Sequence, residues 1–63
     1  MPDKLIPTEA LKLALTKEEE AIELYKKLAI DNPAAKDIFE FLANEEQKHK
    51  KLIEKKIFEL TRY

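Results

Sequence analysis

The sequence contains no cysteine and no glycine, and it has only three prolines. Without cysteine the chain cannot form a disulfide, which is one of the usual ways of stabilising a small domain. A chain of 63 residues buries only about 60% of the surface that its unfolded form exposes. We therefore expect the fold to depend on a bound metal, on association with further chains, or on both.

A large net charge and a long apolar run are also missing. The formal net charge is -1, so no overall field favours a nucleic acid or an anionic membrane as a partner. The apolar pair near the start, Leu5 and Ile6, is too short for a signal peptide, and no run approaches the ~18 residues of a membrane span. We expect a cytoplasmic protein that binds neither nucleic acid nor membrane.

The residues that are present favour helix throughout. Charged residues make up 40% of the chain, and the mixture of Lys, Glu, Leu, Ile and Ala has high helix propensity, so strands are not expected. Either Pro7 in the first turn or Thr8 as an N-cap begins the first helix. The residue before a proline avoids helical angles, so the chain breaks before Pro33, and Asn32 is the expected cap of the second helix.

These signals predict an all-α chain with one domain. A stiff connection without glycine makes the two helices antiparallel neighbours, that is, a two-helix hairpin. The predicted domain spans residues 1–63, with helices at about 8–30 and about 33–60 and a turn at 31–33.

Each predicted helix carries an apolar stripe with steps of three and four, and polar residues interrupt the stripes at only three positions. These positions are Glu18 in the first helix and Glu46 and His49 in the second. Glu18 and Glu46 each lie 14 residues from Asn32, so an antiparallel hairpin places them level with each other, roughly 20 Å from the turn. The stripes are Leu11, Ala14, Glu18, Ala21, Tyr25 and Leu28, and Ala35, Phe39, Leu42, Glu46, His49 and Ile53.

A second set of apolar residues lies off these stripes, and two helices cannot cover all of it. An isolated hairpin would leave a wide apolar face in water, which predicts at least a homodimer that forms a four-helix bundle, or a higher homo-oligomer. This set comprises Leu13, Leu15, Ile22, Leu24, Ile38, Phe41, Leu52, Ile57 and Phe58.

The three polar residues of the stripes have the character of metal ligands. Glu46 and His49 are three residues apart on a helix, so both side chains can reach one cation. A two-fold axis near their level would gather four carboxylates and two imidazoles, the set that four-helix di-iron proteins use. The neighbouring stripe positions hold no Lys or Arg, so without metal the pKa values of these acids should rise and their repulsion should loosen the bundle.

These residues resemble a known family. The segments Ala14-Leu15-x-x-Glu18-x-x-Ala21-x-x-x-Tyr25 and Leu42-Ala43-x-Glu45-Glu46-x-x-His49 look like the first half of a rubrerythrin-type ferritin-like domain. Such domains hold two halves of this kind in one chain. The single half found here is similar to the encapsulated ferritins, in which two subunits share a di-iron ferroxidase centre.

The resemblance implies a role for each site residue. Glu46 would bridge two metals, Glu18 and His49 would be terminal ligands, and Tyr25 would donate a hydrogen bond from the second shell. The implied cofactor is di-iron (Fe2+/Fe3+), and the implied chemistry is that of a ferroxidase-type oxidoreductase, which oxidises Fe(II) with oxygen or peroxide. Manganese or zinc would accept the same ligands.

The same resemblance bears on partners. The sequence has neither the second Glu-x-x-His nor the Cys-x-x-Cys rubredoxin domain of full rubrerythrins, so peroxidase turnover would need an outside electron donor. It also has no long extension after Leu60 of the kind that targets encapsulated ferritins, so an encapsulin shell is not indicated as a partner.

Other readings of these residues remain open. The chain is alternatively a non-enzymatic oligomerisation module whose buried polar layer only fixes the register of the helices, or a peroxide-consuming enzyme of the di-manganese or rubrerythrin type. Tyr25 is alternatively plain core. Glu45 is expected to pair with Lys48 on the surface, and the remaining acids near Glu18 are expected to form a solvated face, namely Glu19, Glu20 and Glu23.

Overall fold

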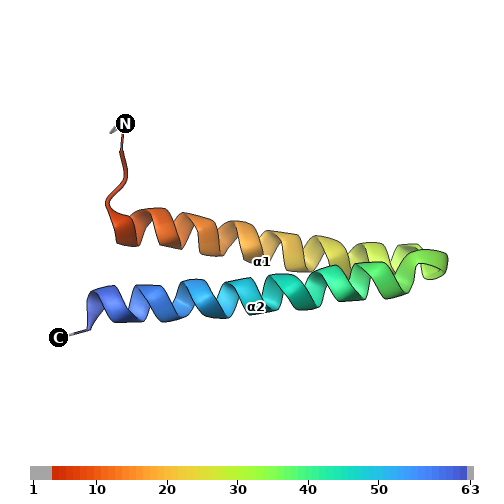
Figure 1. Ribbon diagram of the computed structural model, residues 1–63. Helices are drawn as coiled ribbons and strands as arrows, with labels where there is room; N and C mark the ends of the chain where they lie inside the picture. Colours follow the sequence, from red (N-terminus) through yellow and green to blue (C-terminus); the bar gives the residue numbers. More distant parts are fainter. Residues whose placement is uncertain (1–3, 63) are drawn as a thin grey trace.

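The computed structural model describes residues 4–62, and the remainder of the predicted domain, residues 1–3 and Tyr63, lies outside the described residues. The chain forms two antiparallel helices, α1 (Pro7–Asp31) and α2 (Lys36–Thr61), joined by a short 3-10 turn, η1 (Pro33–Ala35) (Figure 1). Between residues 4 and 62 there is no strand. The all-α hairpin predicted from the sequence is therefore confirmed.

Helix α1 begins at Pro7, because a proline fits the first turn of a helix, where its missing N–H is not needed. The N–H of Ile6 donates to Glu9 Oε1 at 3.2 Å, and the N–H of Ala10 donates to the carbonyl oxygen of Ile6 at 3.0 Å. Glu9 also lies at the positive end of the helix dipole. Of the two predicted starts, the one that uses Pro7 is correct, and Thr8 is not the cap.

Asn32 ends α1 and does not cap α2. Its side-chain Nδ2 and its backbone N–H both donate to the carbonyl oxygen of Leu28, at 3.0 and 2.9 Å. The prediction that Asn32 caps the second helix was wrong, because its side chain satisfies a terminal carbonyl of the helix before it. Pro33 then opens a 3-10 turn, in which the N–H of Ala35 donates to the carbonyl of Asn32 at 2.9 Å, and α2 follows from Lys36.

The closest packing between the helices lies toward the turn. Of the described residues, only Ile22, Ala29 and Ala43 are buried. The small side chains of Ala29 and Ala43 let the helices approach closely, and the side chain of Ile22 fills the space between the two helices. Ile22 was predicted to lie among the surplus apolar residues, and that prediction was wrong. These buried residues form the seam between the two helices. The predicted stripes flank this seam, and their members are half-buried, apart from His49, which is exposed.

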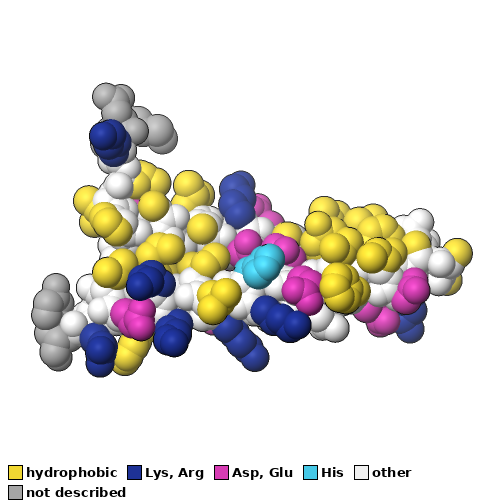
Figure 2. Space-filling model, in the orientation of Figure 1, with side chains coloured by type: hydrophobic (Ala, Val, Ile, Leu, Met, Phe, Trp, Pro, Cys, Tyr) yellow, Lys and Arg dark blue, Asp and Glu magenta, His cyan; other side chains and the backbone are white. Residues whose placement is uncertain are grey.

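A large amount of apolar surface remains uncovered, as predicted. Two apolar patches lie on one face of the hairpin, and a band of acidic side chains with the single histidine separates them (Figure 2). No helix in the described part of the chain is long and apolar enough to cross a membrane. The exposed large apolar residues are Leu5, Ile6, Leu13, Leu24, Ile30, Ile38, Phe41, Leu52, Phe58 and Leu60.

The burial pattern gives a test of the seam. Ile22 is 3% exposed and Ile30, on the same helix, is 78% exposed. Replacing Ile22 by Ala should lower the free energy of unfolding by ~2–5 kcal/mol, because it leaves a cavity between the helices. Replacing Ile30 by Ala should have little effect. Urea unfolding followed by circular dichroism at one fixed protein concentration measures both, and equal losses in the two variants would contradict the packing described here.

Candidate metal centre

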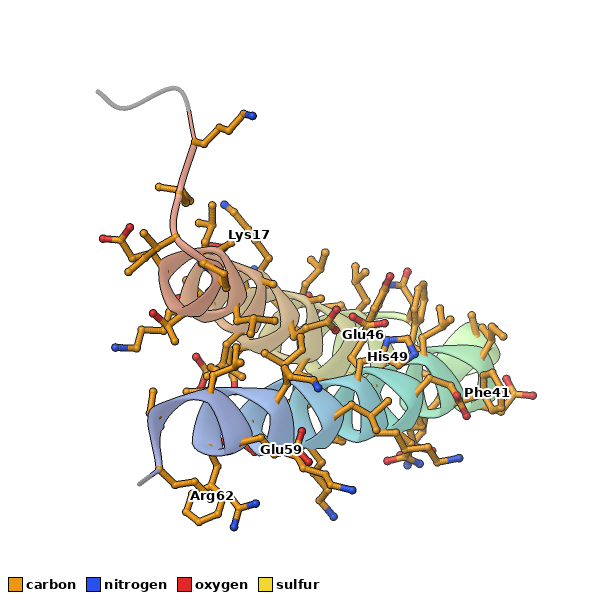
Figure 3. All side chains as sticks on the ribbon, turned by 60° about the vertical axis from the view of Figure 1, so that its left-hand side comes forward. Lys17, Phe41, Glu46, His49, Glu59 and Arg62 are labelled. Atoms are coloured by element: carbon orange, nitrogen blue, oxygen red, sulfur yellow. The ribbon has the colours of Figure 1, made fainter. Side chains whose placement is uncertain are left out.

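The hairpin brings the three predicted ligands together at mid-length. Glu18 comes from α1 and Glu46 and His49 come from α2, and one ligand atom of each lies within 4.8 Å of the others. His49 Nδ1 is 3.4 Å from Glu46 Oε1 and 3.8 Å from Glu18 Oε2. Glu46 and His49 lie next to each other between the two helices (Figure 3). The predicted register, which places Glu18 level with Glu46, is therefore what the structure shows.

The site lies on the open face of the hairpin. The side chains of Glu18 and Glu46 are each 22% exposed, whereas that of His49 is 51% exposed. The carboxylates thus rest against the protein on one side, and the imidazole borders the acidic band between the two apolar patches. A single hairpin encloses this group on one side only.

The two carboxylates are poorly satisfied by the protein. Glu18 Oε2 is buried and has no hydrogen-bond partner among the described residues. When protonated, Glu18 can share a hydrogen bond with Glu46; this bond, burial, and the negative charge of Glu46 together raise the pKa of Glu18, and His49 opposes this rise. A proton between the two acids removes their repulsion, and a cation at the same place would do so too.

The nearest acids outside the group are paired with lysines. Glu45 Oε1 lies 3.2 Å from Lys48 Nζ, which confirms the predicted surface pair. Glu19 was predicted to belong to a solvated face, but its Oε2 lies 3.4 Å from Lys50 Nζ on the other helix. The prediction missed this contact. The available signal was the seven-residue spacing that places Lys50 in line with the buried Ala43.

Tyr25 packs beside Phe39, as the register predicts. The two rings are stacked, with centroids 6.5 Å apart and an interplanar angle of 20°. Tyr25 is half-buried and lies seven residues from Glu18 in the direction of the turn. The hydrogen bonds within residues 4–62 include none from its hydroxyl group. Its packing role is therefore established, and its hydrogen bond to the site stays a prediction.

The donor set fits a transition metal. Carboxylate oxygen and imidazole nitrogen are ligands that iron, manganese and zinc accept. The three ligand atoms are already close enough that small side-chain rotations would bring all of them to one ion. The buried, unpaired Oε2 of Glu18 is an acceptor without a donor, and a bound cation is one partner that would satisfy such an atom.

The fold and the site together define a class: a helical hairpin with a Glu on one helix facing a Glu-x-x-His on the other. The family model described as Rubrerythrin matches residues 9–62. This chain belongs to the rubrerythrin family, and the matched segment contains all three residues of the site. The comparisons with curated proteins and with solved structures give no match.

The raised pKa of Glu18 predicts a pH dependence for the metal-free protein. A group that binds its proton more tightly when folded stabilises the fold fully below its unfolded pKa, and this contribution is lost as the pH rises through the folded pKa. The free energy of unfolding of chelator-treated protein should therefore fall as the pH rises from the range in which an ordinary glutamate titrates toward neutral pH.

The variant Glu18→Gln should flatten this part of the profile, because the glutamine does not ionise. Glu45→Gln, a half-buried neighbour of the site, should not. Melting temperatures between about pH 4 and 7 measure the effect. A wild-type slope that is unchanged in Glu18→Gln would show that another group is responsible.

Proposed function

We propose that this chain is a di-iron protein that binds two metal ions between two copies of the hairpin and oxidises Fe(II). The observation that carries the proposal is the approach of Glu18 to Glu46, with an unpaired buried oxygen on Glu18 and a histidine beside both. Membership of the rubrerythrin family supports iron as the metal.

One hairpin supplies only part of a di-metal site. Two carboxylates and one imidazole leave coordination positions of an ion unfilled and carry two negative charges. A second copy related by a two-fold axis would add the same groups, which gives the four carboxylates and two imidazoles of a di-iron bundle. Four negative charges would then balance two divalent cations.

The exposed apolar surface supports a partner on this face. Only three described residues are buried, while apolar patches lie on both sides of the acidic band (Figure 2). A second hairpin laid over this face would bury both patches and would cover His49, which is the most exposed member of the site. The same contact would exclude water from the metals and complete a four-helix bundle.

The protein residues have separate tasks in this scheme. A cation would compete with the proton for Glu18, whose pKa is raised, so that binding would be coupled to proton release wherever Glu18 is protonated. His49 Nδ1 lies 3.4 Å from Glu46 and 3.8 Å from Glu18 and would be a terminal ligand. The resemblance to rubrerythrin-type domains makes Glu46 the residue that would bridge two ions. When bound at this site, two Fe(II) ions would supply two electrons, which with two protons would reduce oxygen to hydrogen peroxide, or hydrogen peroxide to two molecules of water.

Metal binding should depend on Glu46 and not on its neighbour. The wild-type chain should take up about one divalent ion per subunit, and the bound ion should raise the melting temperature, because it binds only the folded state. Glu46→Gln should weaken binding by more than about 100-fold. Glu45→Gln makes the same chemical change one residue away and should bind as the wild type does.

Calorimetric titration and metal analysis before and after chelation measure these quantities. An oligomerisation module without metal chemistry would keep its full stability in chelator and would show no difference between the two variants. That outcome would end the proposal of a metal protein.

Loading with Fe(II) under anaerobic conditions followed by air tests the redox activity. The wild-type protein should oxidise the iron faster than buffer alone, and Glu46→Gln should remove the acceleration. The absorbance of Fe(III) gives the rate, and light scattering on the same sample should give a mass of at least two chains. Oxygen evolution from peroxide with manganese, and none with iron, would instead indicate a di-manganese enzyme.

A further inference from the structure

One ion pair joins the two helices directly behind the candidate metal centre. Lys50 Nζ on α2 lies 3.4 Å from Glu19 Oε2 on α1. Every other lysine–carboxylate pair within residues 4–62 is contained in one helix, three or four residues apart. Those local pairs are Lys17–Glu20, Lys36–Glu40, Lys48–Glu45 and Lys56–Glu59.

Lys50 differs from the other paired lysines in its surroundings. Its side chain is 27% exposed, whereas those of the others are 58–71% exposed. It also follows the buried Ala43 by seven residues and precedes the half-buried Ile57 by seven, so it occupies a position of the helix–helix seam. A charged residue at a seam position costs stability relative to an apolar one, and its best-attested use is to fix how helices meet.

The pair lies where the buried part of the contact between the helices ends. The buried residues Ile22, Ala29 and Ala43 all lie on the turn side of the level of Glu18 and Glu46. From that level to the chain ends, the described residues are half-buried at most, so the seam alone holds the helices less firmly there. The Glu19–Lys50 contact spans the two helices at this boundary.

The pair also lies on a different flank from the candidate ligands, although it is adjacent to them in sequence. Glu19 follows Glu18, and Lys50 follows His49. Both line a hollow of about 250 Å³ with Ile22, and none of the three candidate ligands lines that hollow. Because the Lys50 ammonium group pairs with Glu19, the negative charge of Glu18 and Glu46 stays available to a cation.

We propose that Glu19 and Lys50 are a positioning pair for the metal site, which holds α1 against α2 so that Glu18 faces Glu46 and His49. This inference rests on the proposed metal-binding function. The pair does not contact the metal in this scheme. It acts by setting the spacing and the rotation of the two helices. Outer residues that position metal ligands typically change affinity by about 10- to 100-fold when they are replaced.

Two single variants separate positioning from a plain effect of charge. If charge alone matters, Lys50→Met removes a positive charge and strengthens binding of a cation, while Glu19→Gln removes a negative charge and weakens it. If the pair positions the ligands, both variants weaken binding, each by roughly 10-fold. The reversed pair, Glu19→Lys with Lys50→Glu, restores most of the affinity because it rebuilds the contact between the helices.

Titration of each variant with Co(II), followed by its visible absorption, measures the affinities. The controls are Lys51→Met and Glu20→Gln, which make the same charge changes at exposed neighbouring positions and should leave the affinity within about 2-fold of wild type. Opposite shifts for Lys50→Met and Glu19→Gln, or failure of the reversed pair to recover, would overturn the positioning role.

A metal-free measurement keeps this inference separate from the proposed function. His49 is the only histidine of the chain, so its ring protons are readily assigned. Nuclear Overhauser effects between these protons and Glu18 report directly on how close the two side chains lie across the helices. They should weaken in both single variants and return in the reversed pair. If the wild type bound no Co(II), the proposed function would fail, but these spectra would still decide whether the pair positions the helices. Unchanged spectra in both single variants would rule out the positioning role.

Discussion

The approach of Glu18 to Glu46 is the constraint on which the rest of this structure depends. Two carboxylates at the same height of a hairpin repel each other when both are ionised, and the buried oxygen of Glu18 finds no donor in the surrounding protein. A proton relieves this situation in part, which is why the pKa of Glu18 is raised. A cation would relieve it further, and His49 would supply another ligand at the same place. The polar group is thus unfavourable for the hairpin alone and favourable for a metal-bound protein.

The fold produces this arrangement with few elements. A turn without glycine sets the register, and the small side chains of Ala29 and Ala43 let the helices come close on the turn side of the site. The site lies at the boundary where this close packing gives way to half-buried contacts. Tyr25 and Phe39 stack on the turn side of it, and Lys50 reaches Glu19 on the other flank. Each of these contacts restricts how the helix carrying Glu18 is oriented toward the helix carrying His49.

Much of this could be predicted from the sequence, because periodicity and distance from the turn determine which residues are level. That reasoning placed Glu18, Glu46 and His49 together and Tyr25 beside Phe39. It could not determine the rotation of each helix about its axis, since Ile22 and Glu18 are only about 40° apart around α1 and belong to one wide apolar arc. Ile22 was therefore assigned to the wrong side.

The Lys50–Glu19 contact was missed although the seven-residue spacing of Lys50 from Ala43 pointed to it. The bond from Asn32 to Leu28 was not foreseen, because an asparagine between two helices can bond to either of them. The open face has one more consequence. If two identical hairpins share the proposed site, every ligand is present in duplicate, and both metal positions would receive the same groups by symmetry. A single amino-acid change would then alter both positions at once, and neither ion could be made chemically different from the other. Selection acting on such an assembly would adjust the two ions only as a unit.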